Sequence, residues 1–188
     1  CSCFLIFRML IWGLLPWGQG LEMSDSWKGR NMADLLVPRG RIVLPAKEEP
    51  SDPSGFFQTR EGLWVSDGFR ERILPVAEPV AVPQTVIATF ELTESANDTR
   101  IRATLPKEHV FEASAFSAHL GGLLQRQIES GEGDLPTNTW IIAYVQAASE
   151  VFAVYFSWYA WSREWDVSCD RLDDYYWYAG CRFLSSNC

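Results

Sequence analysis

The last third of the chain alternates bulky apolar side chains with polar ones, and this pattern constrains the fold more than any other feature of the sequence. Five of the nine Trp residues lie at or after position 140. We predict strands over residues 140–145, 151–160, 164–172 and 175–184. The run 164–172 alternates with period 2, which is typical of a strand with one buried face, whereas 151–160 is apolar on both faces, as expected of a central strand that is covered on both sides. Short connections between such runs favour neighbouring antiparallel strands. The sequence therefore predicts a β-meander at the C-terminus.

One amphipathic helix is expected to pack against this sheet. Residues 112–128 place Phe116, Leu120, Leu123, Leu124 and Ile128 on one stripe at the helical period. The pair Gly121 and Gly122 lies inside the helix and costs about 1 kcal/mol per residue relative to Ala. Either another element approaches the helix closely there, or the helix is broken.

The chain before this helix predicts shorter elements. The run 85–92 is β-branched and alternating, which indicates a strand. Ser66 is placed to cap a short helix over 67–74, and Asn97 or Asp98 to cap another that ends near Leu105. Four prolines punctuate the region from Pro38 to Pro53, so we expect residues 32–55 to form an extended Pro-rich arm. The fold class is α+β, with a single domain over 56–188.

The first thirty-one residues differ from the rest. The apolar run before Trp17 is interrupted by Arg8 and matches neither a secretory signal nor a continuous membrane span. Codons for residues 28–30 can form a purine-rich ribosome-binding string shortly before Met32. Our hypothesis is that translation starts at Met32, giving 157 residues, 31 fewer than the full 188. A start at Met23 and a native membrane anchor over residues 3–17 are the alternatives.

Charge and cysteine content narrow the classes of function. The net charge of −8 repels polyanions, so no nucleic-acid partner is expected, and no membrane partner unless residues 3–17 are native. Past the head only Cys169, Cys181 and Cys188 remain, without a disulfide framework, which favours a reducing, cytoplasmic setting. His109 and His119 are the only histidines and lie ten residues apart. We predict no metal site and no cofactor.

Signals for catalysis are weak, and we expect no catalytic residue. The nucleophile-elbow pattern GxSxG and the phosphate-binding patterns GxGxxG and GxxxxGK[ST] do not occur in the sequence. Acidic pairs such as Glu164 with Asp166 are more simply explained as solvated carboxylates than as a catalytic pair. A hydrolase using Asp166 or Asp170 stays an alternative, because a glycosidase needs two carboxylates in an aromatic-lined cleft.

The aromatic content favours a binding role over an enzymatic one. Aromatic side chains fill cores and are also enriched at interfaces. Since one helix covers one face of the meander, the other face must meet the arm, a second copy or a partner. We predict a small acidic interaction protein that binds a protein partner or itself, with a carbohydrate-binding module as a further alternative. The predicted binding residues are Trp158, Trp161, Trp165, Tyr176 and Tyr178.

Several segments resemble a set of uncharacterised bacterial proteins. They are GLWVSDGFRERI at 62–73, LPKEHVF at 105–111, GEGDLPTNTW at 131–140, and EWDV, YWYAG and RFLS between 164 and 185. The resemblance spans about residues 55–185. It implies no activity, and no site residue follows from it.

Overall fold

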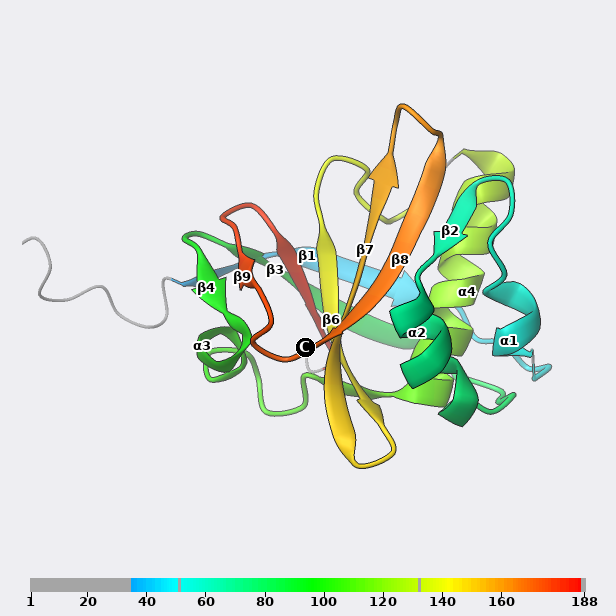
Figure 1. The fold of residues 1–188 in the computed structure, drawn as a ribbon, viewed down its shortest axis with the longest axis horizontal. Helices are drawn as coiled ribbons and strands as arrows, with labels where there is room; N and C mark the ends of the chain where they lie inside the picture. Colours follow the sequence, from blue (N-terminus) through cyan, green and yellow to red (C-terminus); the bar gives the residue numbers. More distant parts are fainter. Residues whose placement is uncertain (1–34, 51, 132, 187–188) are drawn as a thin grey trace, which may run out of the picture. The chain divides into compact units, whose positions relative to one another are not determined.

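The alternating C-terminal runs form the centre of a mixed β-sheet in the computed structural model, which describes residues 35–50, 52–131 and 133–186 (Figure 1). Strands β6 (Ile141–Ala147), β7 (Glu150–Tyr159) and β8 (Glu164–Arg171) are consecutive antiparallel neighbours. These three strands confirm the first part of the predicted meander. The expectations for residues 1–31, for a start at Met32 and for Cys188 lie outside the described residues.

The fourth predicted strand is wrong, because the run 175–184 is two separate strands. Strand β9 (Tyr176–Trp177) pairs with β4 (Ala96–Asn97) in a two-stranded ribbon. The chain then turns through Gly180, whose φ of 94° lies in the region that glycine favours. Strand β10 (Arg182–Ser185) enters the sheet parallel to β6 and antiparallel to β3 (Thr85–Leu92).

The remaining strands complete the sheet in the order β1-β3-β10-β6-β7-β8-β2, with β5 (Val110–Glu112) beside β6. Strand β2 (Leu63–Val65) pairs in parallel with β8 and occupies the position next to it. Residues 36–44 of the predicted arm form β1 (Leu36–Leu44), which pairs with β3 at the opposite edge. Pro38 is tolerated there because an edge strand has one side without ladder hydrogen bonds.

The predicted helix caps are confirmed. Ser66 caps α2 (Asp67–Arg72) by accepting a hydrogen bond from the Phe69 amide, and Asn97 caps α3 (Asp98–Arg102). The short elements α1 (Pro53–Phe56) and the 3₁₀ helix η2 (Leu74–Val76) complete this part of the chain.

The predicted amphipathic helix is α4 (Ala113–Ser130), and it is continuous through its glycine pair. A Cβ atom on Gly121 would lie 3.4 Å from the Phe56 ring of α1, so a second element does approach the helix there. Gly122 has no neighbour within 4 Å of the same built atom. The apolar stripe of α4 packs inward, since Phe116, Leu120, Leu123 and Leu124 are buried. Of the two glycines, only Gly121 marks a close contact with another element.

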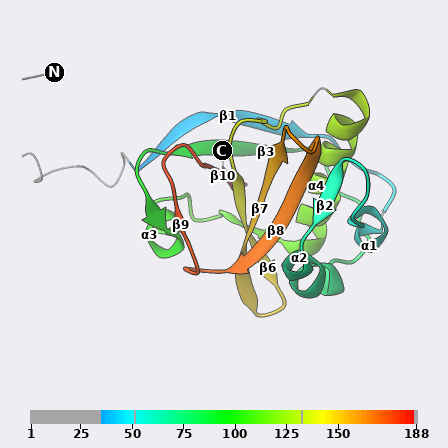
Figure 2. The ribbon, with the colours of Figure 1, turned by 45° about the horizontal axis from the view of Figure 1, so that its top comes forward.

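Each face of the sheet carries its own hydrophobic core. The first face lies under α4 and α2, where Phe69, Leu124 and Trp165 are fully buried. The second face is covered in part by α3 and the β4–β9 ribbon, which bury Ile101 and Phe183 (Figures 1 and 2). The sequence predicted that an arm, a second copy or a partner would cover the second face of the sheet. Part of this face is covered by α3 and the β4–β9 ribbon of the chain itself. None of the described helices is long and apolar enough to cross a membrane.

Two glycine substitutions test the packing of the helices. A Cβ on Gly68 would lie 2.4 Å from the Cys169 carbonyl oxygen of β8. We expect Gly68→Ala to lower the free energy of unfolding by about 1–3 kcal/mol, because backbone on both sides must move. The control Gly122→Ala should raise it by about 0.5–1 kcal/mol, since Ala favours the helix and meets nothing. Urea denaturation measures both. Equal effects of the two substitutions would contradict the close approach of α2 to β8.

Candidate functional site

The structure separates the five aromatic residues predicted to form one binding face. Trp165 is fully buried in the first core, so its side chain is absent from the surface. Trp158 is half-buried and packs on Trp165, with ring centroids 5.9 Å apart. Both belong to the face under α4, because alternate residues of adjacent strands share a face. Only Trp161, Tyr176 and Tyr178 are well exposed, at 84%, 67% and 74%.

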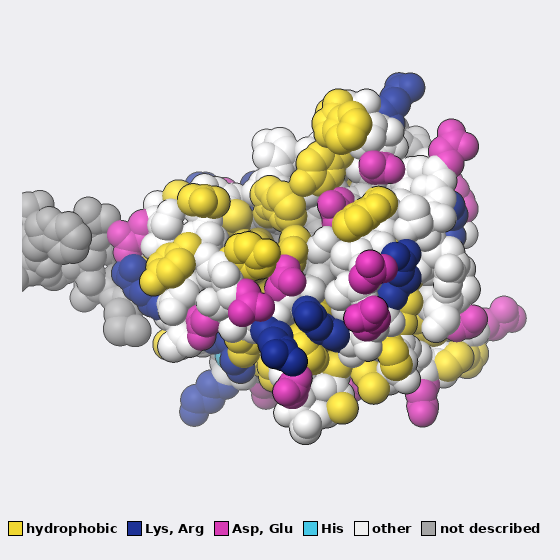
Figure 3. Space-filling model, in the orientation of Figure 1, with side chains coloured by type: hydrophobic (Ala, Val, Ile, Leu, Met, Phe, Trp, Pro, Cys, Tyr) yellow, Lys and Arg dark blue, Asp and Glu magenta, His cyan; other side chains and the backbone are white. Residues whose placement is uncertain are grey.

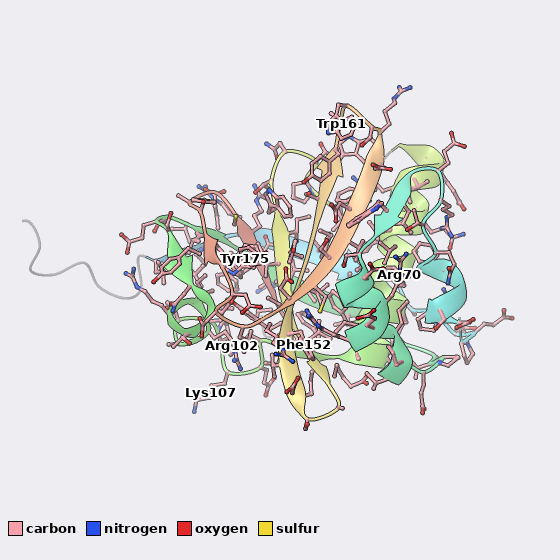
Figure 4. All side chains as sticks on the ribbon, viewed as in Figure 1. Arg70, Arg102, Lys107, Phe152, Trp161 and Tyr175 are labelled. Carbon is pink, nitrogen blue, oxygen red and sulfur yellow. The ribbon has the colours of Figure 1, made fainter. Side chains whose placement is uncertain are left out.

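These three exposed residues belong to a larger cluster on the second face, which we call the aromatic surface. Its members are Trp140, Tyr155, Tyr159, Trp161, Tyr175, Tyr176, Trp177 and Tyr178. Most of the rings follow one another at contact distance, from Trp161 through Tyr159 to Trp140, with centroid separations of 6.5 and 6.2 Å. Figure 3 shows hydrophobic side chains running from the β9 region towards the connection of β7 and β8, with acidic side chains among them. Trp161 stands at that connection, and Tyr175 lies near β9 (Figure 4).

The aromatic surface is hollowed around Trp140. One cavity of about 290 Å³, here called the aromatic recess, is lined by Trp140, Tyr155, Tyr175, Tyr176, Trp177, Tyr178 and Cys181. A second cavity of about 420 Å³ shares Trp140 and Tyr178 and adds the Glu91 and Arg182 side chains. A third, of about 260 Å³, lies between Trp140 and Tyr159. Apolar concavities with few polar groups are the usual form of a ligand site.

A buried carboxylate holds the floor of the recess in place. Asp98, 1% exposed, accepts hydrogen bonds from the Tyr144 hydroxyl at 2.8 Å, the Trp177 indole N–H at 2.7 Å and the Asp173 amide at 2.7 Å. The three donors come from β6, from β9 and from the turn before β9. Burial, followed by the charge of Asp98, raises the pKa of Tyr144 well above its usual range, so this phenol stays a donor.

The turn after β8 makes a second carboxylate contact with α3, this time through the side chain of Asp173. Asp173 has a positive φ of 63°, and its carboxylate accepts hydrogen bonds from the Thr99 amide at 2.9 Å and the Thr99 hydroxyl at 2.6 Å. The hydrogen bond from the Thr99 hydroxyl, and then that from its amide, lower the pKa of Asp173. Helix α3 and the strand-to-ribbon turn are therefore held together by reciprocal carboxylate contacts.

The acids of β8 border the aromatic surface. The Tyr155 hydroxyl donates to Asp170, whose other oxygen lies 3.8 Å from Arg72. Asp166 accepts from the Ser168 hydroxyl at 2.8 Å, and partial burial raises the pKa of Asp166. Asp170, one of the two acids named for a hydrolase, is thus engaged in orienting a ring of the recess.

The contacts and burial of the cysteines and of His109 describe their state in the fold. Burial raises the pKa of Cys169 to about 12 and also raises the pKa of Cys181, so both are free, protonated thiols. The His109 Nδ1 lies 2.6 Å from the Pro106 carbonyl oxygen, and its Nε2 accepts from Arg102. Across the part of the chain that the structure describes, no group of three or more His, Cys, Asp or Glu side chains is arranged to hold a metal ion.

Sequence reasoning missed five residues of the recess lining, which are Trp140, Tyr155, Tyr175, Trp177 and Cys181. One signal was present, because Tyr155 and Tyr159 alternate with the buried residues of the same strand. Nothing in the sequence marks Asp98 as buried, since its partners Tyr144 and Trp177 lie 46 and 79 residues away.

Comparisons with known proteins found no match for this chain. No family model, no curated protein and no solved structure matches it. The resemblance to uncharacterised bacterial proteins stays a prediction.

Removal of the Asp98 carboxylate tests its role as the support of the recess. We expect Asp98→Ala to lower the free energy of unfolding by about 3–5 kcal/mol, because the buried Tyr144 hydroxyl and Trp177 N–H lose their acceptor. The exposed neighbour Asp174 is the matched control, and Asp174→Ala should change stability by less than about 0.5 kcal/mol. Chemical denaturation measures both values. Similar losses in the two variants would contradict a supporting role for Asp98.

The lowered pKa of Asp173 predicts a specific acid sensitivity. Its ionised form is favoured in the folded state, so its contribution to stability is present above the ordinary pKa of 3.8 and is lost as the pH falls through the lower folded value. Asp173→Asn keeps an acceptor oxygen but does not ionise. We expect its stability to change less steeply than that of the parent below about pH 4. Denaturation curves between pH 2 and 5 check this, and parallel acid limbs would contradict it.

Proposed function

We propose that this chain is an interaction protein that binds another protein, or a second copy of itself, through the aromatic surface. The observation that carries the proposal is the exposure of Trp161, Tyr175, Tyr176 and Tyr178 beside a recess on one face. Contiguous exposed aromatic side chains are typical of binding sites, since burying them releases a large apolar area.

The arrangement favours binding over catalysis. The two acids considered for a hydrolase are engaged, with Asp170 held by Tyr155 and Arg72 and Asp166 by Ser168. A hydrolase that uses these acids is therefore the weaker alternative. A carbohydrate-binding module is supported by the cluster of aromatic rings alone, because sugar hydroxyls also need polar partners, and the recess lining is mainly apolar.

Association measurements test the proposal. Native mass spectrometry of the protein, tagged at its C-terminus and purified from the cells that express it naturally, should show a dimer or a defined complex. We expect Trp161→Ala and Tyr176→Ala to weaken that association by about tenfold or more each, as removal of interface aromatics does. Because both side chains are exposed, these substitutions leave the core intact.

A matched control separates the surface from general apolar exposure. Trp64 on β2 is 41% exposed and is not a member of the aromatic surface, so Trp64→Ala should leave association unchanged. Trp165→Ala is unsuitable as a test, since loss of a fully buried Trp costs about 3–5 kcal/mol of stability. A protein that stays monomeric and without a bound partner would overturn the proposal.

A further inference from the structure

Four aromatic rings that line the recess are neighbours of one another at inclined angles. Trp140 and Tyr155 have centroids 5.4 Å apart and planes at 49°, and Tyr155 and Trp177 follow at 5.3 Å and 64°. Tyr175 continues the series, 6.5 Å from Trp177 at 49°. None of these neighbouring pairs is stacked in parallel, and all four rings line the recess.

Carboxylates polarise two of these rings from outside the recess. The Trp177 indole donates to Asp98 at 2.7 Å, and the Tyr155 hydroxyl donates to Asp170. A hydrogen bond donated to an anion shifts electron density onto the donor group and its ring. Both rings are held in fixed positions by the same bonds. The recess lining therefore contains two polarised rings, Tyr155 and the buried Trp177, that are held in position before a ligand arrives.

No basic side chain that the structure describes in the recess lining opposes a positively charged ligand. The lining of the recess includes no Lys or Arg among the described residues, and the chain as a whole carries −8. Arg72 lies 3.8 Å from the far side of Asp170. In the adjoining cavity, Glu91 pairs with Arg182 and Arg39.

The chemistry of the lining selects among cations. A Lys ammonium has three N–H donors and Arg has five, and each donor buried without an acceptor carries a cost. The Trp177 N–H and the Tyr155 hydroxyl are already engaged. The other polar side-chain groups of the lining are the Tyr175, Tyr176 and Tyr178 hydroxyls, the Cys181 thiol and the Trp140 N–H, which can only donate. A quaternary ammonium has no N–H groups, and its methyl groups contact ring faces directly.

We infer that the aromatic recess binds a quaternary ammonium group. The inference rests on the proposed function, because the recess is part of the aromatic surface, and it names the chemistry that this part of the surface takes. The group can be carried by a small molecule such as choline or by a trimethylated lysine of a partner protein.

Isothermal titration calorimetry tests the inference with charge and shape separated. Choline and 3,3-dimethylbutan-1-ol have nearly the same shape, but only choline is charged. We expect saturable binding of choline that is about tenfold tighter than binding of the neutral alcohol, as a cation–π contribution requires. Equal affinities, or no saturable binding of either choline or a trimethyllysine peptide, would overturn the inference. A peptide bound more than tenfold tighter than choline assigns the group to a partner protein, and comparable affinities assign it to a free ligand.

Variants of the exposed tyrosines locate the site. Tyr175→Ala and Tyr178→Ala should weaken choline binding by about fivefold or more, whereas Tyr175→Phe and Tyr178→Phe, which keep the ring, should stay within about twofold. Trp64→Ala, far from the recess lining, should leave the affinity unchanged. Losses in the Phe variants as large as in the Ala variants would overturn the ring-face mode of binding.

The two proposals fail in different ways. A protein that associates through the aromatic surface but binds neither choline nor the trimethyllysine peptide keeps the proposed function and loses this inference. A monomer that binds choline with the expected preference keeps the recess as a quaternary ammonium site and loses the protein-interaction role.

Discussion

The hydrogen bonds to the buried Asp98 carboxylate are the interaction on which the second face of the protein depends. A carboxylate out of contact with water is costly unless it is fully bonded, and Asp98 is bonded by donors from β6, β9 and the turn before β9. These bonds fix the Trp177 ring over the sheet. Without that ring, the β4–β9 ribbon has one large apolar contact fewer and the recess loses its floor.

The recess is also a consequence of strand order. The chain leaves β8 without adding the next antiparallel neighbour, because β2 occupies that position, and it crosses the second face before entering the sheet as β10 between β3 and β6. The crossing segment carries Tyr175, Tyr176 and Tyr178. Its three tyrosines therefore lie above the sheet, beside Tyr155 of β7 and beside Trp140, which immediately precedes β6. A continuous fourth meander strand would have alternated these residues between the two faces.

The aromatic residues on the two faces of the sheet have different roles. Under α4 the aromatic residues are packed to fill space, and Trp165 is inaccessible there. On the second face, hydrogen bonds from Trp177 to Asp98 and from Tyr155 to Asp170 hold two rings of the recess in place. The buried Trp177 forms the floor, and the neighbouring Tyr175, Tyr176 and Tyr178 are exposed. Rings placed in advance lose little conformational entropy when a ligand arrives, which is the physical basis of the proposed binding role.

Local pattern in the sequence determined three central strands, β3, the long helix and the caps at Ser66 and Asn97, because period-2 and period-3.6 alternation and capping act between near neighbours in the chain. The split of residues 175–184, the burial of Trp165 and the exposure of Trp161 were decided only by the tertiary structure. So was Asp98, whose bonding partners lie 46, 75 and 79 residues away. Alternation in the sequence indicates which residues of a strand share a face. Which element covers that face depends on pairings between distant segments of the chain.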